Sequence, residues 1–169
     1  MKSDRIVFSK ISDADISFIY KGLSDEEVTK FYGVHFDSFE EIKEQMVWYK
    51  NLFESESGIW WKFHLSETDE FVGAVGFNSW DKNKGRAEIG CWILPKFWGK
   101  GYGTEALKKA LEYSLKEMEL KKVLAFIDSN NGGIKKVLKK LNFEHFKTSK
   151  ELDPKNGNKI DVDQFKLIN

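Results

Sequence analysis

The chain has 169 residues, a formal net charge of zero at neutral pH and 41% hydrophobic residues. This length and composition predict one folded domain over residues 1–169, and they exclude a disordered chain and a strongly basic nucleic-acid-binding surface. The single cysteine, Cys91, excludes an internal disulfide and a cysteine-based zinc site, and no metal is expected. Because the chain carries no secretory segment and no apolar run of membrane-spanning length, we expect a cytoplasmic protein without a membrane partner.

Hydrophobic periodicity and capping residues predict a strand and three helices at the start of the chain. The expected ranges are 5–11 for the strand and 14–22, 24–33 and 38–54 for the helices. Asp13 is expected to cap the first helix, and two capping boxes, Ser24 with Glu27 and Ser38 with Glu41, open the next two. Four apolar residues recur at helical spacing and predict the buried stripe of the third helix: Ile42, Met46, Tyr49 and Phe53.

The rest of the chain predicts six strands and two helices. The expected strands cover 58–65, 70–80, 85–94, 122–128, 143–150 and 159–168, and the expected helices cover 104–118 and 131–141. A meander followed by alternating helices and strands predicts an α/β (α+β) fold, with a single mixed, mostly antiparallel central sheet of about seven strands flanked by helices. Trp60 and Trp61 are neighbours on one strand, so we expect at most one of them to share a face with the core.

The most informative segment joins the strand 85–94 to the helix 104–118. It places glycines at alternate positions, Gly99, Gly101 and Gly103. Glycines let a ligand approach the main chain closely, and the free N–H groups at a helix start favour an anion. The segment therefore predicts a phosphate site, although its spacing fits neither a P-loop nor a dinucleotide-binding loop.

With its flanking strand and helix, this loop resembles the Q/R-x-x-G-x-G/A loop of the GNAT N-acetyltransferases. Trp98 stands at the Q/R position, and Gly101 and Gly103 stand at the two glycine positions. The run 88–102 is similar in particular to the branch of the ribosomal-protein-alanine N-acetyltransferases. The resemblance implies the GNAT fold, acetyl-CoA as cosubstrate, and coenzyme contacts from Ile93, Leu94, Trp98, Gly99, Lys100, Gly101, Tyr102, Gly103 and Thr104.

A second segment, 131–143, resembles the N-x-x-S-x-x-V-L-x-K-x-G-F segment of the same family. The resemblance implies that Asn131 hydrogen-bonds the pantetheine arm of the coenzyme, although an asparagine suits a helix N-cap equally well. The family's Ser or Tyr residues that protonate the leaving thiolate would fall at Ile134 and Leu138, which cannot donate a proton. Either another donor, such as Tyr102, Tyr113 or water, replaces them, or none is needed.

Two further residues are expected to act in catalysis. Glu88 matches a family glutamate in E-I-G-x-W and is the candidate base, while the alternative is an exposed carboxylate paired with Arg86 or Lys84. The resemblance implies that main-chain N–H groups around Cys91 to Ile93 polarise the thioester carbonyl. The Cys91 thiol itself is expected to be a small buried group rather than a nucleophile.

The resemblance implies a primary amine as the acceptor, with a protein N-terminal α-amine expected first. A small amine (a polyamine, amino sugar or antibiotic) is the alternative enzyme substrate, and an acyl-CoA-binding module with weak catalysis is the alternative from another class. The sequence shows no acidic cluster outside the helix caps, which argues against a polycation. No nucleic acid is expected as a partner, and the resemblance allows a homodimer.

Overall fold

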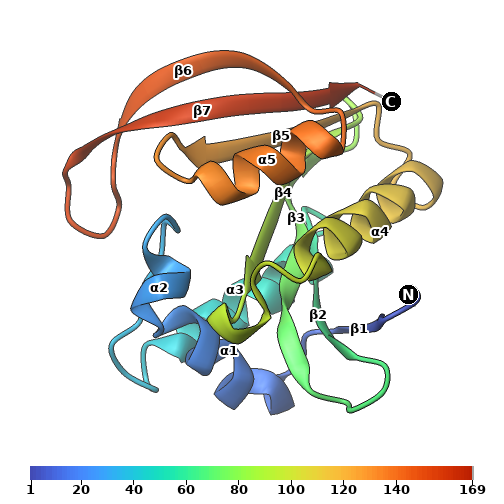
Figure 1. The fold of residues 1–169 in the computed structure, drawn as a ribbon, viewed down its shortest axis with the longest axis vertical. Coiled ribbons are helices and arrows are strands. Elements are labelled where there is room, and N and C mark those ends of the chain that lie inside the picture. Colours follow the sequence, from blue (N-terminus) through green and yellow to red (C-terminus); the bar gives the residue numbers. More distant parts are fainter. Residues whose placement is uncertain (169) are drawn as a thin grey trace.

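The computed structural model describes residues 1–168, which form one seven-stranded sheet flanked by helices (Figure 1). The strand order is β1-β2-β3-β4-β5-β7-β6. Every neighbouring pair is antiparallel except β4 and β5, which are parallel. The strands are β1 Ile6–Lys10, β2 Ile59–Leu65, β3 Phe71–Asp81, β4 Arg86–Ile93, β5 Lys122–Asp128, β6 Glu144–Leu152 and β7 Lys159–Ile168. The predicted mixed, mostly antiparallel sheet is confirmed.

The helices cover both faces of this sheet. They are the 3-10 helices η1 Asp13–Asp15 and η2 Pro95–Phe97 and the α-helices α1 Ile16–Leu23, α2 Glu26–Thr29, α3 Ile42–Glu54, α4 Tyr102–Lys116 and α5 Gly132–Lys140. Helix α3 packs against β2, and α4 packs against β3 and β4. Within residues 1–168, no helix combines the length and the apolar character that crossing a membrane requires.

The prediction that at most one of Trp60 and Trp61 shares a face with the core was wrong. Both side chains are only 5% exposed. The ring of Trp60 packs on Tyr49 of α3, with centroids 5.6 Å apart, and the ring of Trp61 packs on Tyr113 of α4 at 4.8 Å. The two tryptophans do point to opposite faces, but because a helix covers each face, both faces are core.

Helix α3 buries a different fourth residue from the one expected. Ile42, Met46 and Tyr49 are buried as predicted, and Leu52 completes the stripe. Phe53 is 45% exposed, with the ammonium of Lys10 over its ring. Phe53 follows Ile42 by eleven residues and so points to the same side of the helix, which means that helical spacing alone does not predict its exposure in the last turn of α3.

The caps of the first helices also differ from those expected. Asp25 rather than Ser24 caps α2, because its side chain accepts hydrogen bonds from the N–H groups of Glu27 and Val28, and the helix ends at Thr29. Ahead of α1, the carboxylate of Asp15 accepts from the Ser12 N–H at 2.8 Å, so Asp13 is not the cap. In both places several adjacent polar residues are able to cap, and local spacing does not choose between them.

Candidate active site

The sheet opens between its only two parallel strands. Register pairs join β4 to β5 at Arg86–Lys122, Ala87–Val123 and Glu88–Leu124, where the pairing ends. Beyond Glu88, β4 continues beside β3, and β5 continues beside β7 as far as Asp128. The second half of β4 therefore borders a gap in the sheet, and main-chain groups on that side of the strand face the gap instead of a partner strand.

The residues of β4 whose N–H groups face this gap follow from one hydrogen bond. The N–H of Leu94 donates to the Val72 carbonyl of β3 at 2.9 Å. Because N–H groups alternate sides along a strand, those of Cys91 and Ile93 point away from β3 and into the gap. The expected position of the main-chain donors, around Cys91 to Ile93, is consistent with this geometry.

Trp98 contacts the last residue of β4, where the strand borders the gap. Its indole Nε1 donates a hydrogen bond to the Ile93 carbonyl at 2.7 Å, and its ring is 48% exposed. The Ile93 carbonyl points to the same side of the strand as the Ile93 N–H, that is, into the gap. The indole N–H therefore hydrogen-bonds a main-chain group that has no partner strand.

The glycine loop has the backbone that its sequence predicts. Gly99 and Gly101 have φ angles of 74° and 84°, in the left-handed region that favours glycine. Gly101 is the N-cap of α4, and the first hydrogen bond across its opening turn runs from the Glu105 N–H to the Gly101 carbonyl at 3.1 Å. The N–H groups at this helix start have no acceptor within the helix, so they are available to an anion.

Gly103 has a different role. It lies inside α4, and a Cβ on it would stand 3.0 Å from Cδ1 of Ile93. A Cβ on Gly99, by contrast, would meet no atom within 4 Å among the described residues. The alternate glycines therefore combine close helix–strand packing at Gly103 with special backbone angles at Gly99 and Gly101.

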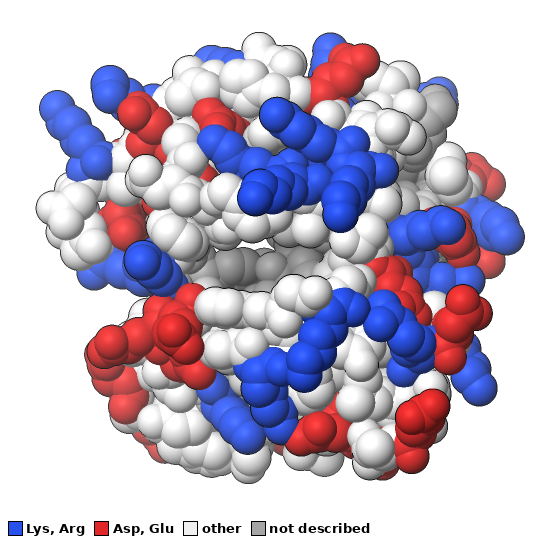
Figure 2. All heavy atoms as spheres, in the orientation of Figure 1, with Lys and Arg blue, Asp and Glu red and all other residues white. Residues whose placement is uncertain are grey.

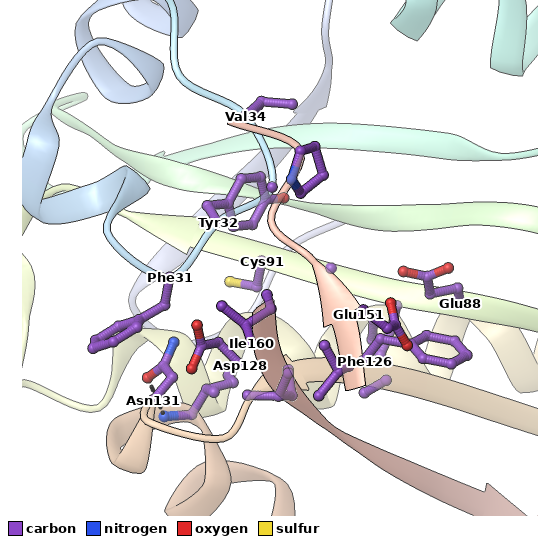
Figure 3. A pocket seen from close by; sticks show the side chains of 18 of the residues that line it. Phe31, Tyr32, Val34, Glu88, Cys91, Phe126, Asp128, Asn131, Glu151 and Ile160 are labelled. Atoms are coloured by element: carbon purple, nitrogen blue, oxygen red, sulfur yellow. Dashed lines mark hydrogen bonds between the residues drawn. The ribbon is translucent and has the colours of Figure 1, made fainter. Parts of the chain in front are cut away.

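A cavity of about 390 Å³ lies beside the gap (Figure 3). Its lining includes Tyr32 after α2, Glu88 and Cys91 of β4, Phe126 of β5 and Asn131 at the start of α5. In Figure 3, Glu88 and Glu151 stand together at one side of the cavity, and Asp128 and Asn131 stand at the other. The structure thus brings the expected base, the Cys91 main chain and Asn131 around one space.

Glu88 is half-buried and lies opposite Asn78 in the register of β3 and β4. Burial raises the pKa of the Glu88 carboxyl, the charge of Glu151 raises it further, and a hydrogen bond with the Asn78 side chain lowers it in part. Of the two alternative partners, Arg86 and Lys84, Lys84 forms an ion pair with Asp81, whose carboxylate lies 3.2 Å from the Lys84 ammonium. A carboxylate with a raised pKa is a stronger base than an exposed one, which suits the role expected for Glu88.

Two weak acids line the cavity together with Glu88, namely Cys91 and Tyr32. Burial raises the pKa of the Cys91 thiol to about 12, so the thiol stays protonated at neutral pH and is a poor nucleophile. Burial also raises the pKa of Tyr32 well above its usual value, with smaller contributions from Tyr49, Cys91 and Glu88. The Tyr32 hydroxyl stands 3.5 Å from where a Cβ would lie on Gly90.

Asn131 has the capping role that was left open beside the coenzyme role. Its side-chain oxygen accepts a hydrogen bond from the Ile134 N–H at 3.3 Å, at the start of α5. Ile134 and Leu138 also line the cavity, so the positions of the expected proton donors are apolar where they face it. Of the suggested replacements, Tyr102 and Tyr113 are not among the residues of 1–168 that line this cavity.

The cavity carries an acidic cluster that the sequence did not reveal. Glu88, Asp128, Glu151 and Asp153 all line it, together with Lys30 and Lys155. The ammonium of Lys155 is occupied, because it donates to the Thr29 carbonyl at the end of α2 at 2.6 Å and lies 4.0 Å from Asp153. The expectation of no acidic cluster was wrong, because these carboxylates come from three strands and one turn that only the fold brings together.

Positive charge gathers on the outer side of the site. Figure 2 shows a hollow in this face, with lysine and arginine side chains gathered over α5 on one side and near the start of α4 on the other. Helix α5 carries Lys135, Lys136, Lys139 and Lys140. A helix start with free N–H groups, a gap with main-chain donors and flanking lysines together fit a coenzyme that has phosphates at one end and a thioester at the other. No group of three or more His, Cys, Asp or Glu side chains in the described part of the chain is arranged to hold a metal ion.

A mixed sheet that opens between two parallel strands, beside a glycine loop at a helix start, defines an acyl-coenzyme-A-dependent transferase. Residues 5–144 match the family described as acetyltransferase (GNAT) domain, and the chain belongs to this family. It is therefore an acetyl-CoA-dependent N-acetyltransferase, as the loop at 98–104 predicted.

Three similar proteins illustrate the range of the family. The uncharacterized N-acetyltransferase YoaA of Bacillus subtilis (strain 168) is 26% identical over 169 residues, which cover 99% of this chain and 96% of that protein. The RimL ribosomal alpha-N-protein acetyltransferase has a TM-score of 0.88 at 16% identity, with 99% of this chain and 92% of that chain covered. The spermidine N-acetyltransferase of Vibrio cholerae, in complex with CoA and spermine, has a TM-score of 0.85 at 18% identity, with 96% and 95% covered. The resemblance to the ribosomal-protein branch is thus confirmed at the level of the fold, which a polyamine enzyme shares.

Proposed function

We propose that this chain moves the acetyl group of acetyl-CoA directly to a primary amine of a small cationic molecule that enters the cavity beside Glu88. The observation that carries this proposal is the position of two carboxylates, Glu88 and Glu151, at the same side of the cavity; burial raises the pKa of Glu88, and the charge of Glu151 adds to this rise. An ammonium group between two such carboxylates relieves the repulsion, and a second positive charge on the same molecule finds Asp128 on the other side of the cavity.

The coenzyme contacts proposed from the sequence agree with the chemistry of the residues. The main chain of residues 98–104 offers N–H groups and a helix start to the pyrophosphate, and Ile93 and Leu94 lead into this loop. The Asn131 amide nitrogen remains available to donate to the pantetheine arm, because the cap uses only the side-chain oxygen. When bound, the coenzyme supplies an activated acyl thioester.

The Cys91 N–H is the donor that we assign to the acyl oxygen. It faces the gap from the middle of β4, three residues after Glu88. A fixed main-chain donor stabilises negative charge as it develops on that oxygen, and it needs no reorganisation during the reaction. Cys91 therefore contributes through its main chain, while its protonated thiol takes no covalent part.

Glu88 is the base that we assign to the acceptor amine. An amine in solution is mostly an ammonium at neutral pH, so it must lose a proton before it attacks. A carboxylate with a raised pKa accepts this proton directly or through a water molecule. The raised pKa of Glu88 lies closer to the pKa of the amine, which makes the proton transfer easier. The Tyr32 hydroxyl stays protonated beside Glu88 and is able to orient the amine, but its high pKa makes it a poor acid toward a thiolate.

A protein N-terminal α-amine remains the second candidate acceptor. The likeness in fold to the RimL ribosomal alpha-N-protein acetyltransferase favours it. The order of the two candidates is reversed relative to the sequence-based expectation because the acidic cluster becomes apparent only in the folded chain. The single-domain organisation, a homodimer and a cytoplasmic location stay predictions.

The test is a thiol-release assay with acetyl-CoA and a panel of acceptors. The panel holds diamines and polyamines, monoamines of matched length as controls, and short peptides with free N-termini. We expect the diamines and polyamines to exceed matched monoamines by about tenfold in kcat/KM, since each added charge meets a carboxylate. Turnover of peptides alone would establish the second candidate, and coenzyme binding without turnover of any amine would favour the binding module.

A further inference from the structure

Arg5 reaches the glycine loop from the residue just before β1, 95 positions away in sequence. Its guanidinium donates from Nε to Glu105 Oε2 at 2.8 Å, and its Nη2 lies 2.6 Å from the same oxygen. Its Nη1 donates to the Lys100 carbonyl at 3.0 Å, and its Cζ lies over the Tyr102 ring, 4.5 Å from the ring centre. One side chain thus contacts three residues of the loop and of the first turn of α4.

The contact with Lys100 fixes the direction of the next N–H group. In a trans peptide the carbonyl and the following N–H point in opposite directions, and no cis peptide occurs in residues 1–168. With the Lys100 carbonyl held by Arg5, the Gly101 N–H points away from the guanidinium. A free carbonyl turned into this loop would repel a phosphate, so the hydrogen bond to Nη1 keeps the peptide in the anion-binding orientation.

Glycine at position 101 also makes room for this contact. A Cβ on Gly101 would stand 3.3 Å from Nη2 of Arg5, tighter than an ordinary van der Waals contact. The glycine therefore serves the loop twice, through its positive φ of 84° and through the space it leaves for the guanidinium.

The contact with Glu105 controls charge near the expected phosphate site. Burial works to raise the pKa of Glu105, but hydrogen bonds from Ser3 and from Arg5 outweigh it and hold the pKa below its usual value. Glu105 is therefore ionised in the first turn of α4, close to the N–H groups that are to bind phosphate. Without a partner, this negative charge would repel the coenzyme, and the guanidinium compensates it.

We propose that Arg5 is a positioning residue of the coenzyme loop, which it holds in the phosphate-binding shape while it compensates the charge of Glu105. This inference rests on the proposed assignment of residues 98–104 to the coenzyme. The choice of residue supports it, since the chain has 27 basic residues but its only arginines are Arg5 and Arg86. Three directed contacts at once need the planar fork of a guanidinium, which the single ammonium of lysine does not provide.

The experiment measures the Kd for acetyl-CoA by calorimetry in the full chain and in four variants, Arg5→Gln, Arg5→Lys, Glu105→Gln and the double variant Arg5→Gln/Glu105→Gln. We expect Arg5→Gln to weaken binding about tenfold and Arg5→Lys to restore only part of the loss. The double variant is expected to bind more tightly than Arg5→Gln alone, because it removes the uncompensated carboxylate. A merely structural role for Arg5 does not predict this recovery.

Steady-state kinetics complete the test. The KM for acetyl-CoA is expected to rise with the Kd in Arg5→Gln, while kcat and the KM for the amine stay within about twofold. Arg86→Gln is the matched control, since Arg86 lies on β4 outside the loop, and its Kd is expected to equal that of the unchanged protein. An unchanged Kd in Arg5→Gln, or a double variant that binds no better than Arg5→Gln, overturns the proposal. If the unchanged protein fails to bind acetyl-CoA, the loop assignment itself fails, whatever the Arg5 variants do.

Discussion

The indole Nε1 of Trp98 donates a hydrogen bond to the main-chain carbonyl of Ile93 at 2.7 Å, so a loop residue replaces the strand partner that β4 lacks. The family resemblance expects Gln or Arg at position 98, and both of these also carry side-chain N–H donors. All three side chains therefore carry an N–H donor, and in this chain the indole N–H of the tryptophan binds the open end of β4.

This relationship predicts the effect of replacing Trp98. Trp98→Phe keeps an aromatic ring but removes the donor, and we expect the Kd for acetyl-CoA to rise about fivefold as the loop loses its anchor on β4. Trp98→Gln retains a donor and is expected to lose less affinity than Trp98→Phe. Calorimetry on both variants checks this, and equal losses would show that ring area rather than the hydrogen bond matters.

Gly101→Val is expected to abolish measurable binding of acetyl-CoA. A β-branched residue is strained at a φ of 84°, and its Cβ would press on the guanidinium of Arg5. Calorimetry at the highest usable acetyl-CoA concentration measures the loss, and circular dichroism checks the fold. Gly157→Val is the control, because its φ is 72° and no atom among the described residues lies within 4 Å of its Cβ position. Similar strain without loss of coenzyme binding is expected there, and equal losses in the two variants would contradict the local role of Gly101.

The ion pair between Asp15 and Lys62 predicts a large effect on stability. Both side chains are mostly buried, at 6% and 15% exposed. Asp15→Asn leaves the Lys62 ammonium without its anion and is expected to lower the free energy of unfolding by roughly 3 kcal/mol. Urea unfolding measures the loss. The exposed pair of Glu40 and Lys43 is the control, and Glu40→Gln is expected to change stability by less than about 0.5 kcal/mol.

The same pair gives a pH dependence of defined sign. Burial works to raise the pKa of Asp15, but hydrogen bonds from Lys62 and Ser12 hold it below its usual value. The stability from this carboxylate is therefore present above its unfolded pKa of about 3.9 and is lost as the pH falls through the lower folded value. Asp15→Asn should remove this part of the acid sensitivity, and an unchanged acid transition would argue against the pair as its source.

The sequence predicted those parts of the molecule that depend on neighbouring residues. The bounds of β5 and β7 agree with the expected ranges, and the loop ahead of α4 shows the left-handed backbone at Gly99 and Gly101. These features follow from local periodicity and from glycine spacing, which a single chain displays directly.

The remaining features depend on contacts between distant segments. Arg5 and Glu105 are 100 residues apart, and the local sequence around either residue does not predict their ion pair. Glu151 joins Glu88 at the cavity only because β7 pairs with β5 and carries β6 beside it, out of sequence order. Strand order in a mixed sheet is not encoded in local spacing. The acidic cavity and the contacts of Arg5 with the glycine loop therefore became apparent only in the folded chain.

Replacing Glu151 and replacing Asn78, the two neighbours of Glu88, are expected to shift the pH dependence of the reaction in opposite directions. Activity is expected to rise with pH as Glu88 loses its proton, at a pH above the usual glutamate value of about 4.3, because burial and the charge of Glu151 raise its pKa. Glu151→Gln removes part of that effect and is expected to shift the acid limb of kcat/KM to lower pH. Asn78→Ala removes the hydrogen bond that lowers the pKa and is expected to shift the limb to higher pH.

Glu88→Gln tests whether the acid limb of the kcat/KM pH profile reports the titration of Glu88. We expect it to lower kcat/KM by about a hundredfold and to remove the acid limb, since an amide accepts no proton. We expect this variant to keep its fold. Because the pKa of Glu88 is raised in the folded state, the stability that protonated Glu88 contributes is present below the unfolded pKa and is lost as the pH rises through the folded pKa. At neutral pH a neutral glutamine is therefore no less stable than glutamate at this position. Rates across pH 5 to 9 with the best acceptor measure both effects. An acid limb that persists in Glu88→Gln, or shifts of the same sign in Glu151→Gln and Asn78→Ala, would remove Glu88 from the mechanism.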